Sequence, residues 1–158
     1  MRTLVLLAAL LLTAGAAVAQ TPVTDAAARA FVASQEAAWN AGDLDAYFSG
    51  YTLGATFTDQ AYVGDKPPVP YGTSSLTEAR KLTAKALARS RSRETTEITR
   101  VEIAADGASA RVLARVRTTV DGASGVRRLC ASRVQTLINA GGKLRSRGRT
   151  DTFYKCPR

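Results

Sequence analysis

The stretch Trp39–Asp59, WNAGDLDAYFSGYTLGATFTD, decides the fold that the rest of the chain adopts. Gly42 ends a preceding helix, because glycine readily takes the positive φ angle common at a helix C-terminus. Asp43 then caps a short helix over residues 44–49, since its side chain can accept a hydrogen bond from the first turn. Aromatic residues follow at the hinge and in the first strand. The stretch therefore predicts a helix end, a second helix and a strand in close succession.

Residues 1–19 have the pattern of a secretory signal peptide. Arg2 precedes an apolar run over residues 4–12, and small residues end at Ala19 before Gln20. The run is shorter than the roughly 20 residues of a membrane-spanning helix, so we expect cleavage after Ala19. We expect an exported protein, periplasmic or secreted, with one domain over residues 20–158 and no transmembrane segment after signal removal.

Charge is distributed unevenly along the exported domain. Residues 20–73 include two basic and six acidic residues, whereas residues 74–158 include 19 basic and seven acidic ones. A basic half of this kind attracts anionic partners or acts as a solubilising surface. Nucleic acid is disfavoured as a partner, because the chain carries an export signal and does not interleave aromatic with basic residues.

The absence of histidine from the whole sequence limits the chemistry of the chain. A Ser-His-Asp or Cys-His triad cannot form, and the commonest metal ligand is missing. The carboxylates and the two cysteines do not follow the spacing of a zinc site. We therefore predict no metal and no cofactor.

Apolar residues at helical spacing predict a first helix over residues 24–41. Gln35 lies in its apolar stripe and needs a hydrogen-bond partner there, so it is either a core glutamine or a cavity-lining one. Ser75 and Glu78 form a capping box, which predicts the start of another helix that ends near Ser90.

Strand signals fill the remainder of the domain. Two short strands are expected over residues 55–58 and 61–64, followed by a proline-rich surface loop over residues 66–70. From Glu94 onward the hydrophobic period changes to two, which predicts an antiparallel meander. Its four strands are expected over residues 94–104, 109–120, 126–138 and 144–155.

Pairing Ile138 with Leu144 across the last hairpin predicts an arginine-rich face on the sheet. This face gathers Arg133, Arg145, Arg147 and Arg149, together with Asp151. We expect it to be an outer, anion-binding face, with the helices covering the opposite side.

The same pairing makes the cysteine geometry awkward. It places Cys130 opposite Thr152, four residues before Cys156, so a disulfide requires the C-terminal tail to bend back. An even pair of cysteines in an oxidising compartment nevertheless favours a Cys130–Cys156 disulfide. Free buried thiols are the alternative.

The stretch Trp39–Asp59 resembles the signature of the nuclear transport factor 2-like superfamily, and the order of predicted elements is similar over the whole exported domain. Ketosteroid isomerases, polyketide cyclases and many non-catalytic binding domains share this fold. The resemblance implies an α+β, cone-shaped fold in which N-terminal helices pack on a curved, mostly antiparallel sheet. It also implies a homodimer, which is common in the superfamily.

Residues 40–45 look the same as the corresponding segment of bacterial ketosteroid isomerases. That resemblance places Asp59 where those enzymes keep their general-base aspartate. Their oxyanion tyrosine falls on Gln35, and their protonated aspartate falls on Val134, which argues against steroid isomerisation. Asp59 is thus a candidate catalytic residue, with a strand-end aspartate that bonds backbone as the alternative.

The function predicted from these patterns is binding of a small apolar molecule in the cone cavity. The candidate ligand-binding residues are Gln35, Tyr47, Tyr51, Asp59 and Tyr62. Two other functions stay open: an isomerase or cyclase that uses Asp59 as general base, and binding of an anion or a partner through the arginine face.

Overall fold

A computed structural model describes residues 21–157, and the predicted signal peptide of residues 1–19 lies outside this range. Helices α1 (Asp25–Ala41) and α2 (Leu44–Ser49) are followed by strands β1 (Tyr51–Ala61) and β2 (Val69–Ser75). Helix α3 (Leu76–Leu87) comes next. The chain ends with the strands β3 (Ser90–Ile103), β4 (Ser109–Gly122), β5 (Gly125–Ala140) and β6 (Lys143–Tyr154).

The helix boundaries in the fold-deciding stretch follow from their caps. Gly42 ends α1 in the left-handed region, with a φ angle of 72°. The Asp43 side chain accepts a hydrogen bond of 2.9 Å from the backbone N–H of Ala46 and so starts α2. Farther along, Ser75 and Glu78 form the predicted capping box at the start of α3. These predictions are confirmed.

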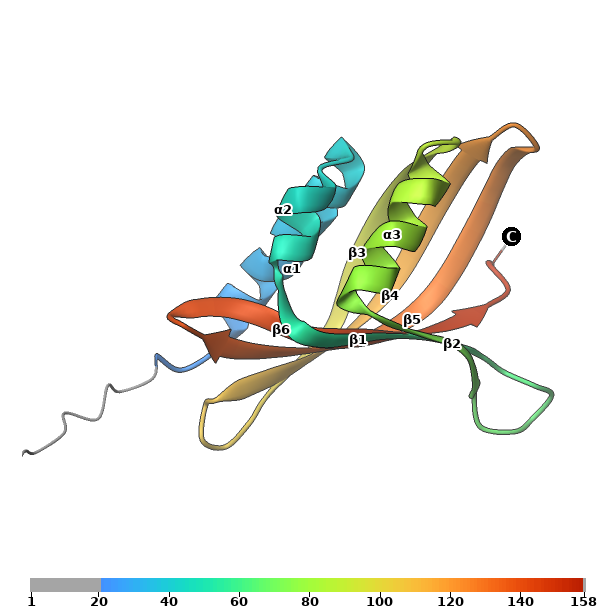
Figure 1. Ribbon diagram of the computed structural model, residues 1–158. Helices are drawn as coiled ribbons and strands as arrows, with labels where there is room; N and C mark the ends of the chain where they lie inside the picture. The colour runs from blue at the N-terminus through green and yellow to red at the C-terminus, as the bar shows by residue number, and fades with distance from the viewer. Residues whose placement is uncertain (1–20, 158) are drawn as a thin grey trace, which may run out of the picture.

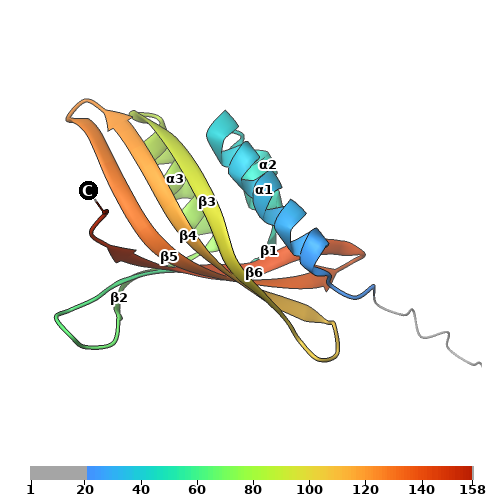
Figure 2. The same ribbon diagram turned by 180° about the vertical axis from the view of Figure 1, so that it is seen from behind.

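The strands form one sheet in the order β2-β1-β6-β5-β4-β3. All neighbouring pairs are antiparallel except β1 and β6, which run parallel. Figures 1 and 2 show the strongly curved sheet with the three helices on its concave side. This arrangement confirms the predicted α+β cone.

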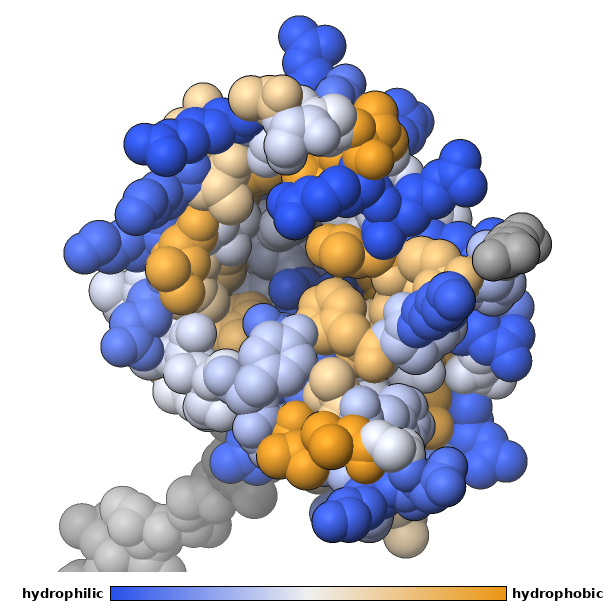
Figure 3. Space-filling model, turned by 90° about the vertical axis from the view of Figure 1, so that its right-hand side faces the viewer, coloured by the Kyte–Doolittle hydropathy of each residue, from blue (hydrophilic) through white to orange (hydrophobic). Residues whose placement is uncertain are grey.

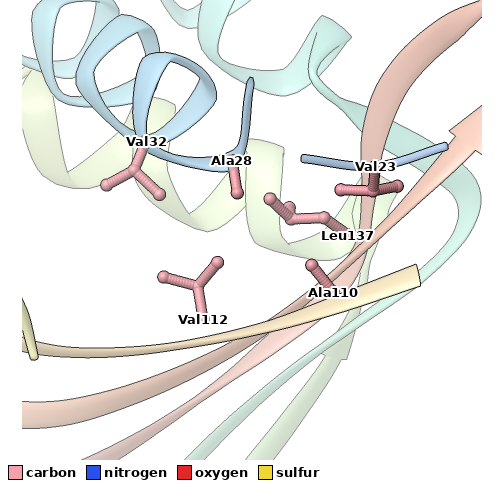
Figure 4. Packing of buried hydrophobic residues seen from close by; sticks show 6 residues of the cluster. All are labelled: Val23, Ala28, Val32, Ala110, Val112 and Leu137. Atoms are coloured by element: carbon pink, nitrogen blue, oxygen red, sulfur yellow. The ribbon is translucent and has the colours of Figure 1, made fainter. Parts of the chain in front are cut away.

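Two buried clusters hold the helices on the sheet. In the first, shown in Figure 4, α1 and the segment before it pack on β4 and β5; the buried residues are Val23, Ala28, Val32, Ala110, Val112 and Leu137. In the second, aromatic residues join α2 to β1, with Tyr47, Phe48, Tyr51 and Phe57 at its centre. Together they fix the α1–α2 side of the cone, and α3 covers the remainder of the concave face.

The prediction of a strand over residues 61–64 is wrong. β1 ends at Ala61, and its partner β2 starts at Val69, inside the segment expected to be a loop. Pro70 therefore belongs to a strand, opposite Gln60. β2 lies at the edge of the sheet, where a proline removes no hydrogen bond needed by a second neighbour.

The expected pairing of Ile138 with Leu144 is also wrong, because Ile138 lies opposite Arg145. Gly141 and Gly142 form a tight two-residue turn with φ angles of 60° and 75°. A bulge between Thr136 and Leu137 shifts the register again.

The corrected register removes the difficulty with the cysteines. Cys130 lies opposite Tyr154, so Cys156 is only two residues farther along the chain. The two Cα atoms are 5.2 Å apart, and the Cys130–Cys156 disulfide is formed. This prediction is confirmed.

Candidate functional site

A cavity of about 360 Å³ lies between α3 and the concave face of the sheet. Its walls are largely apolar, with contributions from Trp39, Leu82, Ala86, Leu87, Val116, Val120, Leu129, Ala131 and Phe153. Figure 3 looks onto an open side of the molecule, where hydrophobic side chains surround a hollow with hydrophilic residues at depth. The curvature of the sheet leaves this space, because α3 spans it without filling it.

The floor of the cavity is a network of ion pairs around Arg133. Its Nε and Nη2 donate to the two carboxylate oxygens of Asp151 at 2.7 and 3.1 Å. Its Nη1 and Nη2 donate to the two carboxylate oxygens of Glu94 at 2.7 and 3.1 Å. All three side chains are almost fully buried. One guanidinium thus satisfies two buried carboxylates, a geometry in which charge-assisted bonds are strong.

The fold-deciding stretch helps to hold this floor in place. The Asn40 side chain donates to the backbone carbonyl of Glu94 at 2.8 Å and accepts from its N–H at 2.7 Å. Next to it, the Trp39 indole N–H donates to the Ser92 hydroxyl at 3.2 Å. The end of α1 therefore positions both an apolar wall residue and the strand that carries Glu94.

Arg149 extends the network toward the aromatic cluster. Its Nε lies 3.2 Å from Asp151, and its Nη1 donates to the hydroxyl of Tyr47. The guanidinium carbon lies 5.6 Å from the ring centre of Phe57, within range of a cation–π interaction. Nη2 makes no hydrogen bond within residues 21–157, and Arg149 lines the cavity. It can therefore donate to a bound molecule.

The network sets the charge state of Asp151. Burial alone raises the pKa of this carboxyl, but Arg133 and Arg149 outweigh burial and hold its pKa below the ordinary value of 3.8. Asp151 is thus ionised at neutral pH and serves as the shared acceptor between two arginines.

Asp59 is in a different electrostatic position. It lies beside Asp151 in the parallel pairing of β1 with β6 and lines the cavity, with much of its side chain exposed. Partial desolvation raises its pKa first, and Asp151 adds to the increase, while Arg149 and Arg133 oppose it. No hydrogen bond or ion pair within the described part of the chain satisfies its carboxylate. Asp59 is therefore free to accept a proton or a hydrogen bond from a ligand.

The other predicted ligand-binding residues lie outside the cavity lining. The Gln35 side chain is buried and donates to the backbone carbonyl of Tyr47 at 3.0 Å, so it is a core glutamine. Tyr47 and Tyr51 are buried in the aromatic cluster, and burial raises the pKa of Tyr47 well above its ordinary value. Tyr62 follows β1 and is 58% exposed. Of the five candidates, Asp59 alone borders this cavity.

The prediction that four arginines share an outer face of the sheet is wrong. Arg133 and Arg149 lie on the concave side, because β4 and β5 pair Arg133 with Ala114 of the apolar face. Arg145 donates to the backbone carbonyl of Ser49 at 2.7 Å, and Arg147 is exposed. The β-bulge in the last hairpin separates these two residues from Arg149.

Sequence reasoning missed Glu94 and the inward position of Arg133. The signal was present in β4, where Val112, Ala114 and Val116 alternate with arginines. Extending that alternation across the β4–β5 turn places Arg133 beside Ala114 on the covered face. Val134, counted as the position of a catalytic aspartate, consequently lies on the opposite, convex side.

Two further findings concern the described residues alone. No group of three or more Cys, Asp or Glu side chains within residues 21–157 is arranged to hold a metal ion. None of α1, α2 and α3 is both long and apolar enough to cross a membrane.

No protein-family model and no curated protein matches the sequence. Solved structures do match the fold. A ketosteroid isomerase-like protein from Erwinia carotovora is 16% identical with a TM-score of 0.65, and the match covers 83% of this chain and 96% of that one. The beta subunit of benzoate 1,2-dioxygenase from Burkholderia mallei is 16% identical with a TM-score of 0.65, and the match covers 84% of this chain and 91% of that one.

An NTF-2-like protein of unknown function from Shewanella oneidensis is 15% identical with a TM-score of 0.59, covering 80% of this chain and 97% of that one. The helices on the concave side of a curved sheet, with a cavity between them, define an α+β fold. The chain has the nuclear transport factor 2-like fold. At these identities the similarity establishes the fold and leaves the function to the residues of the cavity.

Proposed function

We propose that this chain is an exported binding domain that holds a small, largely apolar molecule in the cavity between α3 and the sheet. The observation that carries the proposal is the contrast between apolar walls and an internally satisfied ionic floor. Pockets of this composition bury most of a ligand by apolar contact and orient it with a few polar groups. Asp59 and the free Nη2 of Arg149 supply those groups.

A thermal-shift screen of the protein starting at Gln20 tests the proposal, using small ketones, sterols and aromatic polyketide-like compounds. A ligand at 100 times its dissociation constant stabilises by about 2.7 kcal/mol, which such a screen detects. Ala86→Trp should abolish the response by filling the cavity from α3. Ala84→Trp is the matched control, because Ala84 is also exposed on α3 but does not line the cavity. Equal responses in both variants would contradict the proposal.

Export belongs to the same proposal. The pattern of residues 1–19 supports it, and a disulfide suits an oxidising compartment. Expression of the full chain in a bacterium, followed by N-terminal sequencing of the periplasmic fraction, should give a protein that begins at Gln20. A cytoplasmic protein that keeps residues 1–19 would contradict this part.

A second function is proton transfer next to a carbonyl group, and one observation favours it. Asp59 and Arg149 line the same cavity from neighbouring strands, so a base and a cationic N–H donor face a bound molecule together. Asp59 would take a proton from the carbon next to the carbonyl, and Arg149 would stabilise the negative oxygen that forms. The arginine thereby supplies the electrostatic role for which Gln35 and Val134 are unsuited.

Deuterium exchange into a bound ketone, followed by NMR, separates this function from binding alone. Asp59→Asn should abolish exchange and leave ligand affinity within about tenfold. If the native protein binds the ketone without catalysing exchange, the chain is a binding domain only.

A further inference from the structure

A second candidate binding site lies on the convex face of the sheet, on the side opposite the cavity. A groove of about 460 Å³ runs across β3, β4 and β5 and reaches the C-terminal tail. Its lining residues include Arg93, Thr95, Arg117, Thr119, Arg128, Cys130, Cys156 and Pro157. Strand alternation sets the side, because Glu94 and Val116 face the cavity and their neighbours in the chain face away from it.

Three arginines converge on this groove through the strand register. Thr119 of β4 lies between Arg93 of β3 and Arg128 of β5. In the next row of the same face, Arg117 lies between Thr95 and Cys130. Directly opposed and diagonal positions in a sheet are close enough for long side chains to meet. The three guanidinium groups can therefore reach one bound group.

These arginines have no carboxylate partners, unlike others on the same face. Arg111 lies 3.4 Å from Glu102, and Arg115 lies 3.9 Å from Glu97. Within residues 21–157, Arg93, Arg117 and Arg128 make no ion pair or side-chain hydrogen bond, and no acidic residue lines the groove. The cross-strand neighbours of the three arginines are threonines and a cysteine. The groove thus concentrates positive charge that the protein leaves uncompensated.

We propose that this groove binds a compact oxyanion with two or more negative charges, such as a phosphate or sulfate ester or a diphosphate. Guanidinium groups bind such oxyanions in a bidentate manner, and the hydroxyls of Thr95 and Thr119 add neutral donors. The described lining contains no aromatic side chain on which a nucleic acid base could stack. The site is separate from the cavity that holds the proposed apolar ligand.

The disulfide gives the groove a fixed wall. Cys156 and Pro157 line it, and the bond to Cys130 holds this tail against β5. Rupture of the bond frees the tail, while the three arginines remain on their strands. A site built in this way loses affinity on reduction, whereas a diffuse basic surface keeps its affinity.

Isothermal titration of the protein starting at Gln20 with inorganic pyrophosphate tests the proposal. We expect one binding event at about 20 mM salt that weakens strongly at about 0.5 M salt. Arg117→Gln should weaken binding by about tenfold or more, because it removes one of three charged donors. Arg115→Gln is the matched control, since this arginine faces the same side but already has a carboxylate partner. It should bind as the native protein does.

Two results overturn the proposal. One is a comparable loss of pyrophosphate affinity in Arg117→Gln and Arg115→Gln, which would identify a diffuse basic surface. The other is undiminished affinity in Cys156→Ser, provided that its circular dichroism spectrum shows a folded sheet. Thermal unfolding of each variant without ligand checks its fold, and Arg128→Gln replaces Arg117→Gln if the latter is misfolded.

Discussion

Arg133 shows how a single side chain can determine the floor of a site. It bonds two carboxylates that are each less than a tenth exposed, Glu94 and Asp151. The net contribution of buried ion pairs to stability is small or negative, because desolvation offsets their attraction. Removal of one partner is costly, however, since the other charges then remain buried without compensation.

Arg133→Met should therefore destabilise the protein by about 3–5 kcal/mol in urea unfolding. Arg115→Met, which removes an exposed pair at 3.9 Å, should change the free energy of unfolding by about 1 kcal/mol or less. A similar small loss for both variants would show that the floor is hydrated and that its charges are not truly buried.

Asp59 and Asp151 lie side by side, yet they should affect the pH dependence of stability with opposite sign. The pKa of Asp151 is lowered on folding, so its contribution is present above its unfolded pKa and is lost as pH falls below about 4. The pKa of Asp59 is raised on folding, so its ionised form opposes folding at neutral pH, and this effect disappears as pH falls through its folded pKa.

Asp59→Asn should accordingly stabilise the protein at pH 7 relative to the native chain, and the difference should shrink as the pH approaches 4. Urea midpoints measured across that range, at constant ionic strength, provide the comparison. Asp45→Asn is a suitable control, because Asp45 is exposed on α2, pairs only with the exposed Arg80 and does not line the cavity. A higher urea midpoint for the native protein than for Asp59→Asn at pH 7 would contradict the raised pKa of Asp59.

At the scale of the elements, Gly148 determines how closely two strands approach. A Cβ atom at this position would lie 2.0 Å from the backbone oxygen of Thr56, and the φ angle of 136° is one that other residues rarely adopt. Gly148 follows the bulge in β6, where the strand turns to run beside β1. The continuous register that places Asp59 beside Asp151 begins at this contact, after the pairing of Tyr51 with Ser146.

Gly148→Ala should therefore destabilise the fold by about 3 kcal/mol or more, from backbone strain and overpacking combined. Gly54→Ala in β1 is the control, since nothing lies within 4 Å of an added Cβ there and its φ angle is ordinary. In thermal unfolding, the melting temperature should fall strongly in Gly148→Ala and should change little or rise in Gly54→Ala.

Most elements of this fold could be predicted from the sequence, because caps and periodicity are local signals. The Gly42–Asp43 junction and the Ser75 cap led to correct helix boundaries, and the change to a period of two led to the strand that starts at Ser109. Register could not be predicted in the same way, since it depends on the two-residue Gly141–Gly142 turn and on the bulge between Thr136 and Leu137, which the period-two pattern does not reveal. Arg133, Arg149 and Asp151 were expected on one face, as the structure has them, but on the outer side, because the pairing of Arg133 with Ala114 of the covered face was not used.

At the scale of the whole molecule, the disulfide joins the C-terminal tail to the middle of the sheet. It closes a loop between residues 26 positions apart, so its reduction should cost about 3 kcal/mol through added freedom of the unfolded chain. Denaturant unfolding with and without a reductant should show this difference. In Cys130→Ala/Cys156→Ala the reductant should have no effect, and coincident curves for the native chain would contradict a stabilising bond.

The charge of the whole molecule is also divided in space. The concave side balances its buried charges within one network, whereas the convex side leaves three arginines in a groove without carboxylates. A homodimer remains a prediction. If it forms through the convex face, the second subunit covers the groove, so pyrophosphate and the second subunit should compete for it.

The parallel pairing of β1 with β6 also bears on when this protein can fold. β1 leaves the ribosome early, but one of its two neighbours is the last strand of the chain. Contacts between residues so distant in sequence form slowly, so β1 lacks its inner neighbour β6 until late in folding. The sheet can therefore be completed only after β6 has been synthesised. If the chain is exported unfolded, as its predicted signal peptide implies, the pairing of β1 with β6 can form only after β6 has crossed the membrane.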